Sequence, residues 1–183
     1  IDIEHHIASY NDVEAILEKV DTIAVTDCLC RKQKKFIGAG CSRPSETCFM
    51  FGSMAQYYID NKLGRKIEKA EALKIVAEAQ KSGLVTQPGT SQNPAGMCNC
   101  CGDCCAVLGA IKKYPNPAEI VFTNYFSSIV KDNCTGCGAC IDICPMEAIQ
   151  LSDSGTAEVN LTRCIGCGLC LIACNFDAVK LNE

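Results

Sequence analysis

The stretch "NCTGCGACIDICPMEAIQL", residues 133–151, carries four cysteines separated by two, two and three residues, with a proline after the last. The stretch "RCIGCGLCLIACNFDAVKL", residues 163–181, repeats this cysteine spacing 30 residues later without a gap. Each copy ends in a predicted short strand, at 148–151 and at 178–181, and a turn at 153–155 separates two predicted strands between the copies. Two complete copies in tandem define the fold of the C-terminal part as an internal repeat.

The spacing of the repeat suits a [4Fe–4S] cubane. Three thiolates two residues apart can wrap one face of a cluster in a tight loop, and the fourth opens toward the other side. Glycines at 136, 138, 166 and 168 allow the backbone to come close and to point N–H groups at sulfur. Structural zinc in the same thiolates is the alternative, but zinc sites do not repeat this spacing before a proline.

The C-terminal part therefore resembles the clostridial-type ferredoxin with two [4Fe–4S] clusters. The resemblance implies that one cluster is held by Cys134, Cys137, Cys140 and Cys174, and the other by Cys164, Cys167, Cys170 and Cys144. Asn175 departs from the pattern, because the second copy usually has proline there, and this loosens a turn without removing a ligand. The resemblance implies low-potential electron transfer between redox proteins, one a donor and the other an acceptor.

Nine of the seventeen cysteines lie upstream of this repeat. They stand in the segments "CLCR" (28–31), "CSRPSETC" (41–48) and "CNCCGDCC" (98–105), which we predict to be loops or ends of elements. Cysteines 28 and 30 share one face of an extended chain. Cysteines 41 and 48 flank a predicted helix start, where the helix dipole favours thiolates. In the third segment, residues 98, 101 and 104 stand at gaps of two, whereas adjacent cysteines diverge and are not expected to bind one metal together.

Three kinds of site compete for these upstream cysteines. The preferred hypothesis is one or two further [4Fe–4S] clusters, the second is structural zinc, and the third is a redox-active dithiol or a site that reduces a small substrate. The predicted ligands are eight of the nine: Cys28, Cys30, Cys41, Cys48, Cys98, Cys100, Cys101 and Cys104. Arg31 either pairs with cluster sulfurs or is an exposed loop arginine. No catalytic residue is predicted, and the alternative to an electron carrier is an oxidoreductase subunit that reduces a disulfide.

The upstream pattern of Cys-x-Cys-Arg, Cys…Pro-x-Glu-x-Cys and Cys-Asn-Cys-Cys is similar to a cysteine-rich segment found beside ferredoxin domains in anaerobes. The resemblance runs roughly from residue 13 to residue 126. Such proteins are described only as iron–sulfur proteins, so the resemblance implies a cofactor and names no reaction. Asp103 stands where this pattern leads us to expect a further sulfur, and this leaves the ligand count open.

The composition narrows the class of protein. An odd number of cysteines leaves a disulfide framework one partner short, and no signal peptide precedes the first cysteine, so we expect a reducing, cytoplasmic compartment. No apolar run approaches the length of a membrane span. The net charge of −4, with only a short basic run at 32–35, predicts no nucleic-acid partner, and no nucleotide-binding glycine motif is present. His5 and His6 are interpreted as solvated rather than metal-binding.

The periodicity of the chain predicts an α+β protein with two domains. Residues 1–126 form a mixed cysteine-rich domain and residues 127–183 a dicluster ferredoxin domain. In the first, apolar spacing and capping residues predict helices at 12–20, 47–61 (capped by Ser45), 70–82 and 106–113, a strand at 23–25 and a loop at 86–96.

Overall fold

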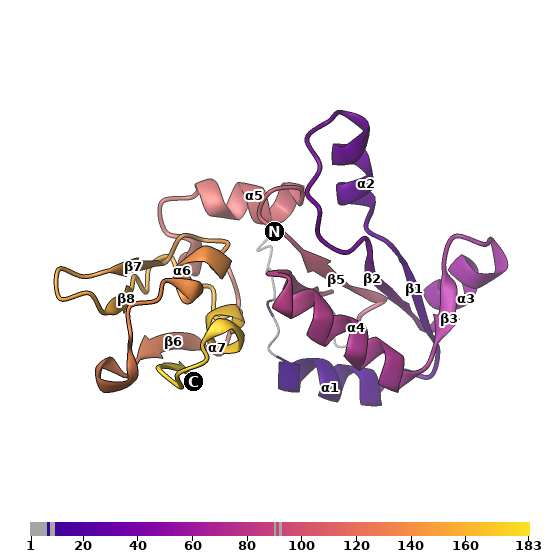
Figure 1. Ribbon diagram of the computed structural model, residues 1–183. Coiled ribbons are helices and arrows are strands. Elements are labelled where there is room, and N and C mark those ends of the chain that lie inside the picture. Colours follow the sequence, from indigo (N-terminus) through magenta and orange to yellow (C-terminus); the bar gives the residue numbers. More distant parts are fainter. Residues whose placement is uncertain (1–6, 8–9, 90, 92) are drawn as a thin grey trace.

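The computed structural model describes residue 7 and residues 10–89, 91 and 93–183, so His5 and His6 lie outside the described residues. Figure 1 shows a larger N-terminal part, built on a sheet, beside a smaller C-terminal part with short strands. Helices and strands alternate through the chain, and this confirms the predicted α+β class. None of the helices in the described part is both long and apolar enough to cross a bilayer.

The N-terminal part is built on one sheet whose paired neighbours are all antiparallel. In spatial order its strands are β3 (Arg65–Ile67), β1 (Ile23–Asp27), β2 (Glu46–Phe51), β5 (Gly96–Cys100) and β4 (Val85–Pro88). Ile23 pairs with Phe51, Val25 with Phe49, and Phe49 in turn with Met97. Because side chains alternate between the faces of a sheet, this register gathers apolar residues on one face.

Helices α1 (Tyr10–Glu18) and α4 (Lys69–Lys81) cover that apolar face (Figure 1). Val13 and Leu17 of α1 and Val76 of α4 are fully or almost fully buried against it. The remaining helices of this part are α2 (Leu29–Phe36), α3 (Gly52–Asp60), α5 (Ala106–Lys113) and the 3₁₀ turn η1 (Pro117–Glu119). Cys48 and Cys98, the neighbours of Phe49 and Met97, lie on the opposite face of the sheet.

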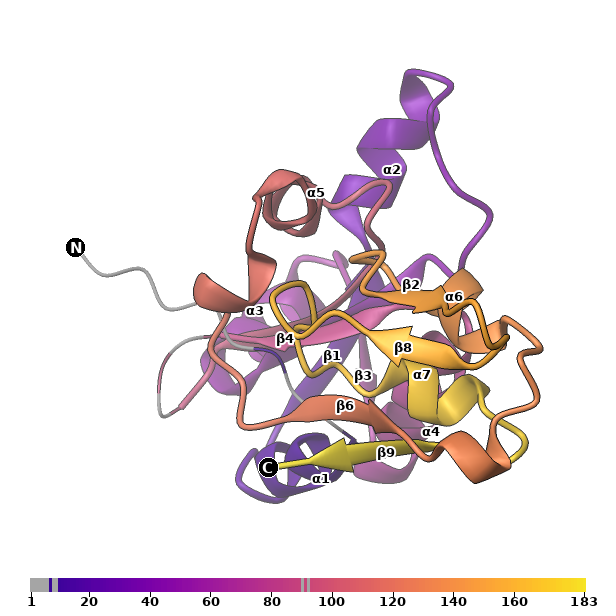
Figure 2. The same ribbon diagram turned by 90° about the vertical axis from the view of Figure 1, so that its left-hand side faces the viewer.

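The C-terminal part contains two small antiparallel pairs that follow the sequence repeat. Strand β6 (Phe126–Ile129) pairs with β9 (Val179–Asn182), and β7 (Ile149–Leu151) pairs with β8 (Ala157–Val159), as Figure 2 shows for β6 and β9. The 3₁₀ turn η2 (Lys131–Asn133) precedes the first copy, and each copy contains one short helix, α6 (Ala139–Ile143) or α7 (Leu169–Ala173). The backbone repeats as well, because Glu147 and Asp177, 30 residues apart, have φ values of 53° and 51°.

One apolar core joins the two parts of the chain. Val85 and Leu108 from the N-terminal part share it with Met146, Ile165 and Leu169 from the C-terminal part, and all five are buried. Arg163 crosses between the two parts with one hydrogen bond, from a terminal nitrogen to the Lys112 oxygen at 3.1 Å, while its Nε donates to the Met146 oxygen of its own part at 2.8 Å. The position of the repeat relative to α5 is therefore set by packing and by a directed hydrogen bond.

Several elements match their sequence predictions and two do not. Helices α4 and α5 and the hairpin turn at 153–155 are confirmed, and Gly83 directly after the α4 cap has a φ of 77°. The predicted helix at 47–61 is wrong at residues 47–51, because residues 46–51 form the buried strand β2 between β1 and β5, so Ser45 caps no helix. The predicted loop at 86–96 is wrong at both ends, because it contains most of β4 and the start of β5. Helix α2 was not predicted.

Candidate metal centres

Two cavities in the C-terminal part are each lined by four cysteines. The first is lined by Cys134, Cys137, Cys140 and Cys174. The second is lined by Cys144, Cys164, Cys167 and Cys170. The structure therefore brings together the same two sets of four that the resemblance implies, and in each cavity one cysteine comes from the other copy of the repeat.

Close backbone approach shapes both cavities. A Cβ atom on Gly166 would lie 2.1 Å from the Tyr125 oxygen, and one on Gly136 would lie 2.3 Å from the Gly155 oxygen. Both glycines also have positive φ values, of 64° and 69°, which other residues rarely adopt. Glycine is therefore required at these two positions for the cysteine loops to close.

The cavity sulfurs accept hydrogen bonds from the surrounding protein. The Ala157 N–H lies 3.3 Å from Cys134 Sγ, and the Ala148 N–H lies 3.3 Å from Cys144 Sγ. The Ser127 hydroxyl lies 3.1 Å from Cys170 Sγ. Hydrogen bonds to ligand sulfurs offset negative charge and raise the reduction potential of an iron–sulfur cluster.

Burial alone disfavours free thiolates in the second cavity. It raises the pKa of Cys167, and it raises the pKa of Cys170 to about 11. Four sulfurs converging on an otherwise apolar cavity therefore need a positively charged centre to become anionic ligands. Iron–sulfur clusters provide that centre and bind four thiolates, so the residues present fit the group.

The sequence comparison agrees with this geometry. Residues 133–178 match the family model of the 4Fe-4S dicluster domain. The C-terminal part is a dicluster ferredoxin-type domain. Over 29 residues the chain is 59% identical to a probable ferredoxin of Methanosarcina thermophila, a match that covers 16% of this chain and half of that protein. The dicluster domain thus accounts for two [4Fe–4S] clusters and for electron transfer, and all seventeen cysteines of the chain are free of disulfides.

The upstream cysteines fall into two groups in space. The larger group, called the six-cysteine group below, contains Cys28, Cys30, Cys48, Cys98, Cys100 and Cys105. A hydrogen bond from Cys48 lowers the pKa of Cys28 to about 6, and one from Cys100 lowers the pKa of Cys105 to about 6. Cys98 interacts with both Cys48 and Cys100 and so joins these two pairs.

Strand alternation explains how the six-cysteine group forms. Phe49 pairs with Met97 on the face that α1 and α4 cover, so their neighbours Cys48 and Cys98 point to the opposite face. Cys100, two residues beyond Cys98, shares that opposite face. Cys48 consequently lies on a strand, and the predicted position near a helix N-terminus is wrong.

Arg31 lies beside the six-cysteine group and is completely buried. It donates to the Asn99 oxygen at 3.1 Å and to the Thr47 hydroxyl, while its Nε has no hydrogen-bond partner among the described residues. No ion pair joins Arg31 to a carboxylate of the described residues. Since Arg31 is part of α2 and buried, the interpretation as an exposed loop arginine is wrong.

The smaller group contains Cys41, Cys101 and Cys104, whose sulfurs all lie within 4.8 Å of one another. Cys101 follows β5 directly, so alternation turns it away from Cys100 and toward the end of α4. The expected divergence of adjacent cysteines is therefore confirmed at this pair. Cys104 packs in the same cluster as Cys101.

Two further sequence predictions are corrected by these groups. The spacing that suggested Cys98, Cys101 and Cys104 as one set is misleading, because Cys98 lies on the other face of the sheet with Cys48 and Cys100. Cys105 was left out of the predicted ligands, yet it contacts Cys100 and accepts the Leu108 N–H at 3.4 Å. The signal that could have indicated this hydrogen bond is the position of Cys105 one residue before a predicted helix, because N-cap side chains accept hydrogen bonds from the first turn.

Proposed function

We propose that this protein relays low-potential electrons between two redox proteins through three iron–sulfur clusters. Two are the clusters of the dicluster domain, for which we take residues 127–183, and the third is a [4Fe–4S] cluster in an N-terminal domain, residues 1–126. In the dicluster domain, the ligands are the two sets of four cysteines that line the cavities. In the N-terminal domain, the ligands come from the six-cysteine group, which contains more sulfurs than the four that one cubane needs.

The observation that carries this proposal is that cysteines of all three sites pack in connected parts of the core. Cys100 and Cys105 of the six-cysteine group belong to the same apolar cluster as Cys144 and Cys164 of the second cavity. Cys144 also packs in the cluster that contains Cys140 of the first cavity. Packed side chains without intervening solvent therefore connect all three sites, which gives the order N-terminal cluster, second cavity, first cavity.

The ends of this route reach the surface. Cys98 of the six-cysteine group and Cys137 of the first cavity are both exposed, whereas Cys100, Cys140 and Cys170 are buried. An exposed ligand shortens the distance from a cluster to a docked protein. One partner is therefore expected to dock near Cys98 and the other near Cys137.

Arg31 supports the presence of a cluster in the N-terminal domain. A buried cation is costly unless an anion compensates it, and no carboxylate of the described residues does so. A [4Fe–4S] site with four thiolates carries a net negative charge of about two, which would compensate a guanidinium placed beside Cys28. The unused Arg31 Nε is available as a donor to such a group.

We propose a reducing, cytoplasmic compartment, a proposal that the free cysteines and the proposed iron–sulfur clusters support. The proposal is tested by iron and sulfide analysis of anaerobically purified full-length protein, with an EPR-monitored redox titration. We expect about twelve iron and twelve sulfide per chain and three low-potential one-electron couples. About eight iron would refute the third cluster and leave the dicluster domain alone.

An enzymatic role for the N-terminal site gives a different result. If the six-cysteine group reduced a substrate, a small disulfide would reoxidise the reduced clusters rapidly without any protein acceptor. For a relay we expect slow reoxidation by small disulfides and fast reoxidation by a protein acceptor. Cys28→Ser should lower the iron content by about four per chain, whereas Ser53→Cys, which places a thiol outside all the cysteine groups, should leave it unchanged.

A further inference from the structure

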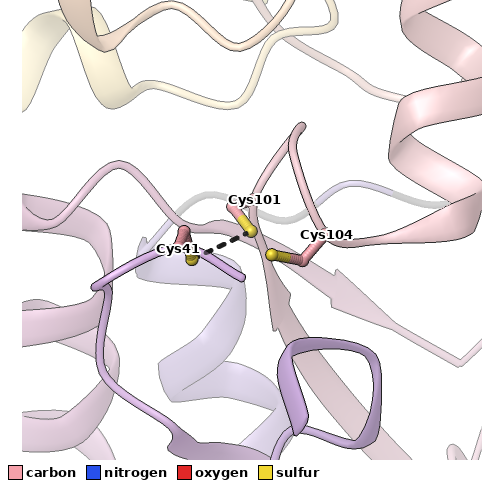
Figure 3. A group of neighbouring side chains, drawn as sticks. All are labelled: Cys41, Cys101 and Cys104. Carbon is pink, nitrogen blue, oxygen red and sulfur yellow. Dashed lines mark hydrogen bonds between the residues drawn. The ribbon is translucent and has the colours of Figure 1, made fainter. Parts of the chain in front are cut away.

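Cys41, Cys101 and Cys104 have a different geometry from the cysteines of the two cavities. Their sulfurs point toward one another from two separate loops (Figure 3), and Cys41 Sγ lies 3.7 Å from Cys101 Sγ. All three sulfurs lie within 4.8 Å of one another. The two cavities of the C-terminal part suit cubanes, and among the described residues no three of their sulfurs lie this close together.

This spacing fits one metal ion rather than a cubane. A tetrahedral zinc ion with Zn–S bonds of 2.3 Å places two of its sulfurs about 3.8 Å apart. Thiolates of a cubane bind different iron atoms and are necessarily farther apart. The ferredoxin-type cavities of the same chain show that wider arrangement, so they serve as an internal reference.

The surroundings also suit a bound cation. Cys101 and Cys104 are 1% and 3% exposed and pack against Ala79 and Leu84, so three thiolates there would be costly without a cation. Arg43 lies beside Cys41, donates from Nε to the Ser82 oxygen at 2.9 Å and pairs with Asp103. One zinc ion with three thiolates carries a net charge of −1, and the Arg43 guanidinium, which also pairs with Asp103, lies beside it.

We propose that Cys41, Cys101 and Cys104 bind one zinc ion and that its fourth coordination position is taken by water or another ligand from outside the chain. Among the described residues, no fourth His, Cys, Asp or Glu side chain belongs to this group. Asp103, which stands between Cys101 and Cys104 in the sequence, is not a fourth ligand, because it is exposed and pairs with Arg43. Zinc sites with three protein ligands and one exchangeable ligand are typical of chemistry rather than of structure alone. This site is separate from the proposed relay, which uses the six-cysteine group.

The site is tested with full-length protein purified anaerobically from zinc-containing medium. Zinc is expected at about one per chain, and X-ray absorption at the zinc edge should report three sulfur ligands and one light ligand without imidazole scattering. This absorption measurement needs no variant, and iron does not contribute to the signal. Four sulfurs, or an imidazole, would overturn the open position, and absence of zinc would overturn the site.

Adjacent cysteines provide matched variants. Cys104→Ser should reduce bound zinc at least tenfold and leave the iron content unchanged, whereas Cys105→Ser should lower iron and leave zinc unchanged. The same contrast is expected for Cys101→Ser against Cys100→Ser. Loss of iron instead of zinc in Cys104→Ser would show that the three cysteines hold an iron–sulfur cluster. About eight iron per chain with zinc retained would refute the proposed third cluster and leave the zinc site standing.

Discussion

Arg31 donates a hydrogen bond to the backbone oxygen of Asn99, 3.1 Å away and 68 residues later in the sequence. Asn99 stands between Cys98 and Cys100, and Arg31 directly follows Cys30. The contact therefore ties two cysteine segments together at the edge of the six-cysteine group. It also holds a buried positive charge where we place the third cluster.

Replacing this charge should change the reduction potential of the N-terminal cluster. Reduction adds a negative charge that the guanidinium stabilises, so Arg31→Met is expected to lower that potential. For an assumed separation of about 6 Å and an effective dielectric constant of about 20, the interaction is roughly 3 kcal/mol, or roughly 130 mV for one electron. An EPR-monitored titration measures the shift. Arg65→Met, which removes an exposed arginine paired with Glu46 and Glu71, should leave the potential unchanged.

The glycines of the repeat should differ in their tolerance of a methyl group. Gly166→Ala forces a Cβ atom to within 2.1 Å of the Tyr125 oxygen, whereas Gly138→Ala meets nothing within 4 Å. Both have positive φ, so Gly138→Ala should cost about 1–2 kcal/mol from backbone strain alone, and Gly166→Ala clearly more. The loss of cluster absorbance in denaturant measures the difference. If both variants lost cluster absorbance at the same rate, the close approach of Gly166 to the Tyr125 oxygen would not be what requires glycine there.

Cys144 should belong to the second cluster although it lies in the first copy of the repeat. It lines the cavity with Cys164, Cys167 and Cys170, so Cys144→Ser should disrupt that cluster. The magnetic interaction between the two reduced clusters of the dicluster domain should disappear from the EPR spectrum, and the first cluster should remain. Cys174→Ser should do the reverse. If Cys144→Ser removed the first cluster instead, the assignment of ligands would be wrong.

Arg163 should hold the dicluster domain against α5. Its hydrogen bond to the Lys112 oxygen crosses to α5 from a half-buried charged group, so Arg163→Met should destabilise this contact by about 1.5–3 kcal/mol. Proteolysis between residues 114 and 126 should become faster while the iron content stays the same. Lys180→Met, at an exposed position on β9, is the control and should leave the cleavage rate unchanged.

The sequence by itself determined the dicluster domain, because its ligands are local. Gaps of two and three residues confine three sulfurs to one loop, and glycines such as Gly136 permit that loop whatever surrounds it. The 30-residue repeat then supplies the fourth ligand of each set. Helix α4 was equally predictable, since its apolar spacing and the glycine after its cap are contained within the segment.

The grouping of the upstream cysteines was decided only by the tertiary structure. Cys98 and Cys101 have ferredoxin-like spacing, but β5 lies between β2 and β4, and alternation along a strand sends them to opposite faces. Cys48 joins Cys98 because the register of β2 against β5 places them together, and no local pattern encodes that register. Long-range pairing therefore separated nine similar thiols into a six-cysteine group beside a buried arginine and three cysteines spaced for a single ion.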